Sequence, residues 1–433
     1  MKLNIKKVGK IRYQKGEGIF LYLSFIFALF GTTSTLIYYI LPTSKYQGIF
    51  AVSLLLIEIY LLTFVDKIKF YKNEAMYLIL LVLLLLFAVI RTGWNTVAIA
   101  MYAASIIFCF LSFTNISISK IVKMTILLFL IMDIVYAVFT VLSFLSPSLY
   151  LNHIVNLFPD NKTKLIKLYN QGSIAGLTSH YSTNGMFLAT GLVISAARYN
   201  SSKQRKDLFL IILFLITLLM TGKRAHVLFG VAAIFVLYFY SKSNENAVNK
   251  WVKTFGIILL VGCAGFIVIS AFPGLSGMFT RFQDTLDGGD VSNGRFELWT
   301  LAVDGFKDNP VLGIGWKQYR NKISPLFSTA TVFDTHNVYL QLLCETGIIG
   351  FTAYLIWFVR IFGETIRLFK KISMDKINLV EENYLVGFSL ICQTFFFLYC
   401  FTGNPLYEMY MYIPYFMSCS ITLYYTHKMR SNP

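Results

Sequence analysis

Charged residues are scarce in this sequence. They make up 14% of its 433 residues, whereas hydrophobic residues make up 56% and the mean hydropathy is +0.64. A soluble domain carries about 25% charged residues. This chain therefore cannot bury its apolar residues in one water-soluble core, and its composition favours a protein that crosses a membrane many times.

Cysteines in polar loops are also lacking. All six cysteines fall inside apolar runs, without the spacing of a disulfide framework or a zinc site. The first apolar run has no small-residue cleavage site, so we interpret it as a retained span rather than a signal peptide. No convincing internal repeat is visible.

Apolar runs of roughly 20 residues, the length that crosses a bilayer, recur along the chain. We predict twelve spans, near 18–41, 46–65, 74–90, 95–113, 120–146, 183–198, 207–221, 225–240, 254–272, 337–358, 379–401 and 406–425. The predicted fold is an all-α polytopic membrane protein with three regions. These are 1–272 with nine spans and an outer loop near 147–182, a large extracytoplasmic loop at 273–336 containing short amphipathic helices, and 337–433 with three spans and a cytoplasmic C-terminus.

The distribution of basic residues predicts the orientation of the spans. Segments on the N-terminal side of the membrane hold 25 of the 38 lysines and arginines, against 13 on the other side. Because cytoplasmic segments carry the excess of positive charge, both termini are predicted to be cytoplasmic. The net charge of +17 is then mainly an orientation signal, and no nucleic-acid partner is expected.

Two arginines lie at predicted helix starts on the outer face. Arg295 opens a helix predicted over 293–308, with Ser292 or Asn293 as its cap, Pro310 after its end and an apolar face of Phe296, Trp299, Val303 and Phe306. Arg224 follows Lys223 in the corner "TGKRAH". A cation at the positive end of a helix is locally unfavourable, so these arginines either reach lipid headgroups or form a site for an anion such as a diphosphate.

His336 stands at the start of the tenth predicted span, with Thr335 as expected cap and Asn337 as polar neighbour. A histidine at this position is either structural or a general base. Weaker candidates are Glu58 and Asp133 inside spans, and His180, which either lines a substrate groove or only caps the sixth span. "DGGD" at 287–290 is typical of a turn rather than a metal site.

Several motifs resemble those of the O-antigen ligase/polymerase superfamily, which includes the Wzy-type polysaccharide polymerases. "RFELWTLAVDGFKDNPVLGIGWKQY" and "THNVYLQLLCETGIIG" match an Arg…Trp…Asn-Pro…Gly-x-Gly pattern followed by His-Asn, Gln and Glu-x-Gly. "LLMTGKRAHVL" resembles the Thr-x-x-Arg corner of the family, and "IAGLTSHYSTNGMF" its Gly-then-Asn segment. Ser173 stands where many members have an arginine. The resemblance covers roughly 172–350.

The resemblance implies a chemistry. Members of the superfamily are metal-independent, inverting glycosyltransferases on the outer face of the bacterial cytoplasmic membrane, and they use glycans on undecaprenyl diphosphate. It implies His336 as the catalytic base, with no metal or cofactor. It implies Arg224 and Arg295 as the residues that hold the diphosphate. With these we place Lys223, Asn337 and His180 in the predicted substrate-binding group. The expected partners are a lipid-linked donor and acceptor, the bilayer and a chain-length regulator.

Three functions remain open at this point. A polymerase joins lipid-linked repeat units, whereas an O-antigen ligase transfers the glycan to lipid A-core. The richness in Lys, Ile, Phe and Asn is typical of an AT-rich genome and of sugar-specific gene clusters, which favours the polymerase. A lipid-linked oligosaccharide flippase is the non-enzymatic alternative. The concentration of charge at the outer face, rather than at the midplane, speaks against a flippase.

The predicted orientation can be tested by cysteine labelling. In a background whose native cysteines do not react, Ser292→Cys should label with an impermeant thiol reagent on intact cells, and Ser202→Cys should label only after lysis. Labelling of Ser202→Cys on intact cells would reverse the orientation and move the candidate site to the cytoplasmic face.

Overall fold

The computed structural model describes residues 118–242, 294–326, 333–374 and 380–431, with Ser292 and short pieces between 245 and 256. The first four predicted spans and nearly all of the ninth lie outside these residues. So do Glu58, Asn293 and the predicted turn at 287–290.

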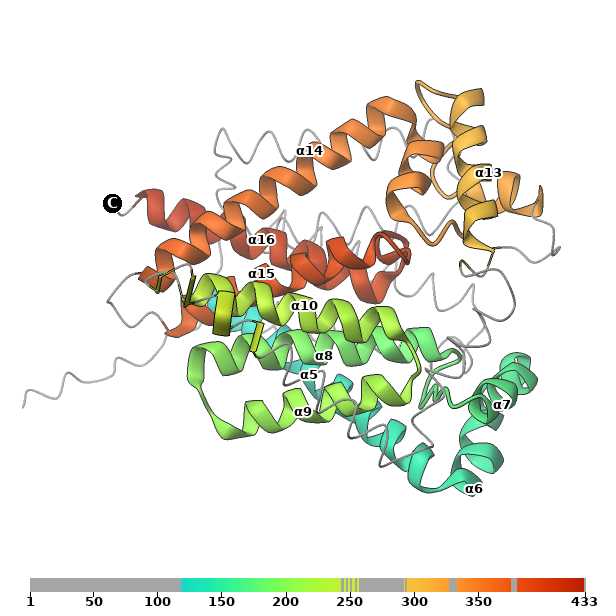
Figure 1. Cartoon of the computed structure of the whole chain (residues 1–433), viewed down its shortest axis with the longest axis horizontal. Coiled ribbons are helices and arrows are strands. Elements are labelled where there is room, and N and C mark those ends of the chain that lie inside the picture. The colour runs from blue at the N-terminus through green and yellow to red at the C-terminus, as the bar shows by residue number, and fades with distance from the viewer. Residues whose placement is uncertain are drawn as a thin grey trace, which may run out of the picture.

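Every regular element in the described part of the chain is helical, which confirms the predicted class (Figure 1). The longer helices are α5 (Ile118–Leu145), α7 (Lys162–Asn170), α8 (Tyr181–Ser202), α9 (Arg205–Met220), α10 (Arg224–Ser241), α13 (Arg295–Asp308), α14 (Val338–Met374), α15 (Val380–Tyr399) and α16 (Met409–Ser431). Single turns include α6 (Pro147–Leu149), η1 (Tyr150–Ile154), η2 (Val155–Leu157), η3 (Pro159–Asn161), η5 (Tyr319–Ile323), η6 (Ser324–Leu326) and η7 (Pro405–Tyr407).

Helices α8 and α15 form the centre of the bundle. Helix α8 contacts α5, α9, α10 and α15, and α15 also contacts α14 and α16. Small residues allow this close approach: a Cβ on Gly191 would lie 2.3 Å from the Phe214 ring of α9, and one on Gly230 of α10 would lie 2.8 Å from Leu192. Residues 183–197 of α8 are all buried, so this helix is covered by protein on every side.

Helices lie at all seven predicted spans that fall within the described residues. Three of them are long and apolar enough to cross a membrane by length and composition, namely Val122–Leu145, Arg224–Ser241 and Val338–Met374. The total of twelve spans stays a prediction. Helices α6, α7 and α13 gather at one end of the bundle, and the C-terminus lies at the other end (Figure 1).

Helix α14 differs from its prediction in length and in shape. The expected span ended near 358, but the helix continues to Met374 because Ile361, Leu368 and Phe369 remain buried against the bundle. It also breaks at Gly347, whose φ is 62°. The loop after α13 packs against this break, and its backbone supplies the hydrogen bonds that the helix has lost there.

Three backbone hydrogen bonds join the loop to the break. The N–H of Ile348 donates to the Pro310 carbonyl at 2.8 Å, and the N–H groups of Ile314 and Gly315 donate to the carbonyls of Cys344 and Glu345 at 3.0 and 2.8 Å. The close approach of the loop to α14 requires a glycine in the loop and another in the helix. A Cβ on Gly313 would lie 2.3 Å from the Glu345 carbonyl carbon, and one on Gly347 would lie 2.3 Å from the Val311 oxygen.

Helix α13 lies on α14 through a different face from the one predicted. The buried residues are Leu298, Ala302 and Gly305, whereas Phe296 of the predicted face is 64% exposed. Gly305 determines which face of α13 packs on α14, because only glycine allows so close an approach: a Cβ there would lie 2.8 Å from the Cys344 sulfur. The helix begins at Arg295, after Gly294 at φ 76°. The expected cap residue Ser292 contributes its hydroxyl, which accepts the N–H of Phe296 at 3.3 Å.

The Gly347 break can be tested by substitution. Gly347→Ala should lower the thermal stability of the detergent-solubilised protein by about 2 kcal/mol or more, because its Cβ has to displace backbone and its φ is positive. Gly363→Ala in the same helix is the matched control, since a Cβ there meets only the end of the Arg367 side chain at 3.8 Å. Equal stability of the two variants would contradict a required break.

Candidate functional site

The turn before α14 holds His336 in an unusual conformation. Its φ is 52°, in the left-handed region that non-glycine residues seldom adopt. The helix cap is Asn337, not Thr335 as predicted: the Asn337 side-chain oxygen accepts the N–H groups of Tyr339 and Leu340 at 3.0 and 3.2 Å. The Thr335 hydroxyl instead accepts the N–H of Asn337 at 3.1 Å. Both neighbours of the histidine are therefore fixed.

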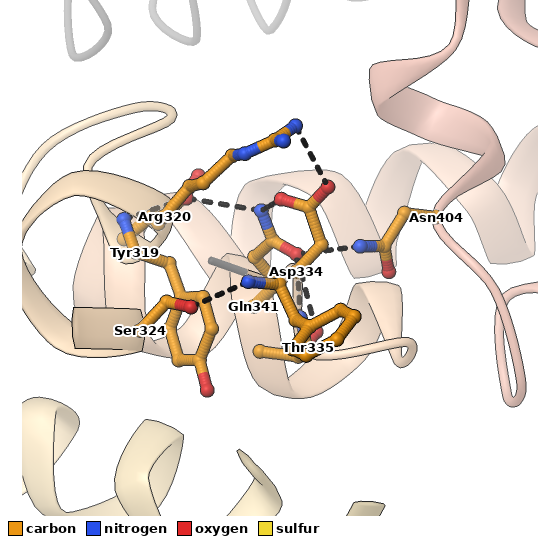
Figure 2. A network of polar contacts seen from close by, with 9 residues as sticks. Tyr319, Arg320, Ser324, Asp334, Thr335, Gln341 and Asn404 are labelled. Carbon is orange, nitrogen blue, oxygen red and sulfur yellow. Dashed lines mark hydrogen bonds and ion pairs between the residues drawn. The ribbon is translucent and has the colours of Figure 1, made fainter. Parts of the chain in front are cut away.

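Gln341 is the hydrogen-bonding centre beneath this turn (Figure 2). Its side-chain oxygen accepts from the Thr335 hydroxyl at 3.1 Å and from the Asn404 amide at 2.9 Å. Its amide nitrogen donates to Asp334 Oδ1 at 3.3 Å and to Glu345 Oε1 at 3.1 Å. An amide is the side chain that can accept and donate in this way, so Gln341 joins the turn to the inside of α14.

Glu345 extends the same network into the loop after α13. Its carboxylate accepts the N–H groups of Lys317 and Tyr319 at 2.8 and 3.1 Å. It also accepts the Tyr407 hydroxyl at 2.9 Å. The side chain is buried, and these bonds with that of Gln341 replace the water that a buried carboxylate needs.

Two further contacts attach the histidine turn to its neighbours. The indole N–H of Trp299 in α13 donates to the Thr335 carbonyl at 3.0 Å. The N–H of Val338, at the start of α14, donates to the Cys400 carbonyl at the end of α15 at 2.9 Å. The position of His336 is thus set by α13, α14 and α15 together.

The structure brings the predicted cations to this histidine. His336 is half-buried, and burial together with the charges of Lys223 and Arg295 lowers its pKa to about 4. Burial also lowers the pKa of Arg295, and the nearby charge of Arg224 lowers it further. Charge effects of this kind act over short distances, so Lys223 and Arg295 lie near His336, and Arg224 lies near Arg295. The imidazole is therefore neutral at pH 7 and stands beside a cluster of cations.

The corner that carries Lys223 and Arg224 is built on the segment before α8. The N–H of Ile174 donates to the Met220 carbonyl at 3.1 Å, and Gly222 at φ 69° leaves room for the Ser173 hydroxyl, which would lie 2.5 Å from a Cβ. Ser173 is fully buried beneath the corner. In this chain that position supports the corner and presents no cation.

The Gly-then-Asn segment also has a structural role. Asn184 in α8 donates to the Thr140 hydroxyl at 2.8 Å and to the Ile174 carbonyl at 3.3 Å. Gly176 at φ 54° packs against this amide, so that a Cβ would lie 3.1 Å from its nitrogen. Because the corner rests on this segment, Asn184 acts on the site through the backbone that it holds.

His180 caps α8, one of its two predicted roles. Its ring nitrogen Nδ1 accepts the N–H of Ser182 at 3.2 Å. Its ring also packs against Tyr181 with centroids 4.4 Å apart, and Lys223 Nζ lies 5.5 Å from the centre of that tyrosine ring. His180 is therefore linked to the cation cluster through Tyr181.

Asp133 takes no part in the hydrogen bonds of this site. It is fully buried in α5, and its carboxylate oxygens have no hydrogen-bond partner among the described residues. The structure gives no reason to include it in the site.

Sequence reasoning left several site residues without a role. Gln341 and Glu345 stood in a motif but were given no function, and Tyr399 and Glu408 were missed. Tyr399 lies close to Arg295, Glu408 and Ser182. Glu345 and Glu408 could have been singled out from the sequence. Both lie inside predicted spans, where ionised groups are costly and often functional.

Comparison with known families gives a match over the part of the chain that holds this cluster. Residues 209–355, about a third of the chain, match the family model of the O-antigen ligases. This part of the chain is similar to that family. The match confirms the resemblance to the O-antigen ligase/polymerase superfamily, whose members are of the glycosyltransferase type. The matched residues include Arg224, Arg295 and His336. No curated protein matches the chain.

Replacement of Gln341 tests the hydrogen-bond network beneath the His336 turn. Gln341→Glu keeps the shape of the side chain but loses both donated hydrogen bonds and places three carboxylates together. We expect a lower melting temperature in detergent, and a larger loss at pH 8 than at pH 5 because protonation restores a donor. Gln204→Glu at the exposed start of α9 is the control. A loss that does not change with pH would contradict this account.

Proposed function

We propose that the protein is a polysaccharide polymerase for O-antigen or capsule. It joins repeat units carried on undecaprenyl diphosphate, on the outer face of the bacterial cytoplasmic membrane, as an inverting glycosyltransferase that needs no metal. The observation that carries the proposal is the neutral, half-buried His336 beside Lys223, Arg224 and Arg295. A base and a cation cluster at one point suit a reaction in which a hydroxyl attacks and a diphosphate leaves.

The reaction assigns a role to each group. A ring nitrogen of His336 takes the proton from an acceptor hydroxyl, whose oxygen forms the new bond to the anomeric carbon of the donor. The bond between that carbon and the diphosphate oxygen breaks, and its electron pair leaves on the diphosphate. Attack opposite to the leaving group inverts the anomeric configuration. Arg224 and Arg295 receive the negative charge, which guanidinium groups bind through paired hydrogen bonds.

The low pKa of His336 keeps its ring in the neutral form that a base needs. A base must be neutral before it accepts a proton, and this imidazole stays neutral at pH values where an ordinary histidine is half protonated. The bound diphosphate raises this pKa by its negative charge, so the proton is held more firmly once the donor is in place. The neighbouring cations thus lower the pKa of His336, whereas the bound diphosphate raises it.

The similarity to the O-antigen ligases supports one alternative acceptor. A ligase would use the same donor and the same histidine but transfer the glycan to lipid A-core. Purified protein with lipid-linked repeat unit alone separates the two, because a polymerase forms a ladder of products without lipid A-core. A flippase would form no glycosidic bond with either acceptor.

Variants of His336 and Arg295 test the assignment. His336→Ala should retain donor binding but lower the rate of bond formation by about 10²- to 10⁴-fold. Arg295→Ala should lose donor binding, and Arg295→Lys should restore it only in part. His153→Ala, an exposed histidine of the outer loop, is the control. The measurements are donor binding, polymer formation and the pH dependence of kcat/KM.

The pH profile has a defined sign. Activity needs neutral His336, so kcat/KM should fall as the pH drops, and its midpoint should lie below pH 6.5 because it reports the free enzyme. EDTA should leave the rate unchanged. A rate above a third of wild type in His336→Ala would remove the general-base role.

A further inference from the structure

Helix α7 is packed against the C-terminal end of α5 (Figure 1). The Tyr169 hydroxyl donates to the Ser143 carbonyl at 3.1 Å, and the Tyr169 ring stacks on that of Tyr150 with centroids 4.8 Å apart. Leu165 is the buried residue of α7 and belongs to the main hydrophobic core. Residues Val122–Leu145 of α5 are long and apolar enough to cross a membrane. Helix α7 therefore lies where such a span leaves the hydrocarbon for the headgroups.

The exposed surface of α7 carries an excess of positive charge. Lys162, Lys164 and Lys167 are all exposed. None of the ion pairs within 4.0 Å in the described part of the chain involves them. The sequence from 147 to 182 contains these three lysines and a single acidic residue, Asp160. The three charges are therefore available to an anionic partner.

Large apolar side chains are exposed on the elements beside this basic helix. Leu142 and Leu145 at the end of α5 are 37% and 70% exposed, and Leu157 in η2 is 51% exposed. Turn η2 contacts α7, and α5 contacts η1. Exposed leucines next to lysines are typical of a segment that lies in a membrane interface, with its apolar side chains in the acyl region and its cations among the headgroups.

The three lysines point in different directions from the axis of α7. At about 100° per residue, Lys164 and Lys167 lie about 60° apart, whereas Lys162 lies about 140° or more from both. The buried Leu165 lies between Lys162 and Lys164 around the axis. Cations that diverge in this way do not form one phosphate pocket. They suit a layer of anionic headgroups around the helix, which flexible lysine side chains can reach from either side.

We propose that α7 is a membrane-docking helix that binds anionic phospholipid headgroups, such as those of phosphatidylglycerol, through Lys162, Lys164 and Lys167. The charges of the lysines and the lipid phosphates are complementary, and the exposed leucines beside α7 enter the acyl region of the same leaflet. This lipid surface goes beyond the glycosyl transfer proposed above and does not depend on it.

Docking of α7 has a consequence for the corner that carries Arg224. The N–H of Ser173 donates to the Leu168 carbonyl at 2.9 Å, which joins the support of the corner to the last turn of α7. The Ser173 hydroxyl lies directly against Gly222 of the corner. Headgroups that hold α7 therefore also fix the depth of the corner, and with it the height of Arg224 relative to the membrane surface.

The test measures which lipid lies next to α7. Leu157→Cys, in a background whose native cysteines do not react, carries a bimane fluorophore. The full-length protein is reconstituted in vesicles of phosphatidylglycerol and phosphatidylcholine, and the acyl chains of either one lipid or the other are brominated. Bromine quenches the fluorophore at short range, so the ratio of the two quenching efficiencies gives the local preference for the anionic lipid. We expect a ratio above one.

Charge variants show whether the lysines cause this preference. Lys162→Gln, Lys164→Gln and Lys167→Gln in one protein should bring the ratio close to one, because each lysine near an anionic surface contributes up to about 5-fold. The melting temperature should stay unchanged, since all three side chains are exposed. Arginine at the same three positions keeps the charge and should keep the ratio. The control variant loses three exposed cations at the start of α9 and the end of α14: Arg205→Gln, Lys206→Gln and Lys371→Gln.

Three results would overturn the proposal. They are a ratio of one before any lysine is replaced, a ratio that survives the glutamine substitutions, and a ratio that the arginine variant loses. The diphosphate of a lipid-linked donor is the other possible occupant. If unbrominated lipid-linked repeat unit at a low mole fraction displaces brominated phosphatidylglycerol from Leu157→Cys, α7 is a donor site and membrane docking fails. None of these measurements requires bond formation, so they stand or fall independently of the proposed function.

Discussion

The buried carboxylate of Glu345 is the contact on which the site depends. It collects hydrogen bonds from the loop after α13, from Gln341 one turn earlier in α14, and from Tyr407 before α16. These segments are far apart in the sequence, and the carboxylate is where they meet. Through Gln341 the same network reaches Thr335 and fixes the turn of His336. The conformation of the His336 turn is thus determined from inside the protein rather than from its surface.

The break at Gly347 makes this arrangement possible. A helix that passes through a membrane has to satisfy its own backbone, and an interrupted helix is tolerated only where other protein supplies the missing hydrogen bonds. Here the loop from Pro310 to Gly315 supplies them. The Asn-Pro and Gly-x-Gly parts of the motif therefore serve the break, and the Glu-x-Gly part is the break itself. Residues that look like a catalytic signature are largely the means of joining a loop to a helix.

Part of the fold could be predicted from the sequence, because long apolar runs indicate helices that bury their side chains. The orientation inferred from the basic segments stays a prediction. The start of α10 at Arg224 and that of α14 near His336 were placed to within about two residues. The buried face of α13 was predicted wrongly, since Phe296 and Trp299 suggested that the aromatic side of the helix would be the buried one. The packing was decided by Gly305 and Ala302, which approach α14 closely. Hydrophobic periodicity predicts which face of a helix is apolar. It does not show which face has side chains small enough for a neighbouring helix to approach closely.

The candidate site was predictable where a residue acts by its own charge, and not where it acts through others. Arg224, Arg295 and His336 stood out because a cation at a helix start or a histidine at an interface needs a reason. Gln341 did not stand out, since its function lies in four partners that come together only in the fold. Glu408 was missed for a similar reason, because its neighbours belong to α8, the histidine turn and the loop after α13.

Helix α13 carries two of these contacts on one rigid body. Arg295, beside the cations of the corner, and Trp299, which holds the Thr335 carbonyl, are four residues apart and so lie on the same side of the helix, about 6 Å along its axis. Any displacement of α13 shifts Arg295 and the support of the His336 turn together. In the proposed reaction, the alignment of the leaving diphosphate with the attacking hydroxyl would therefore be preserved or lost as a unit.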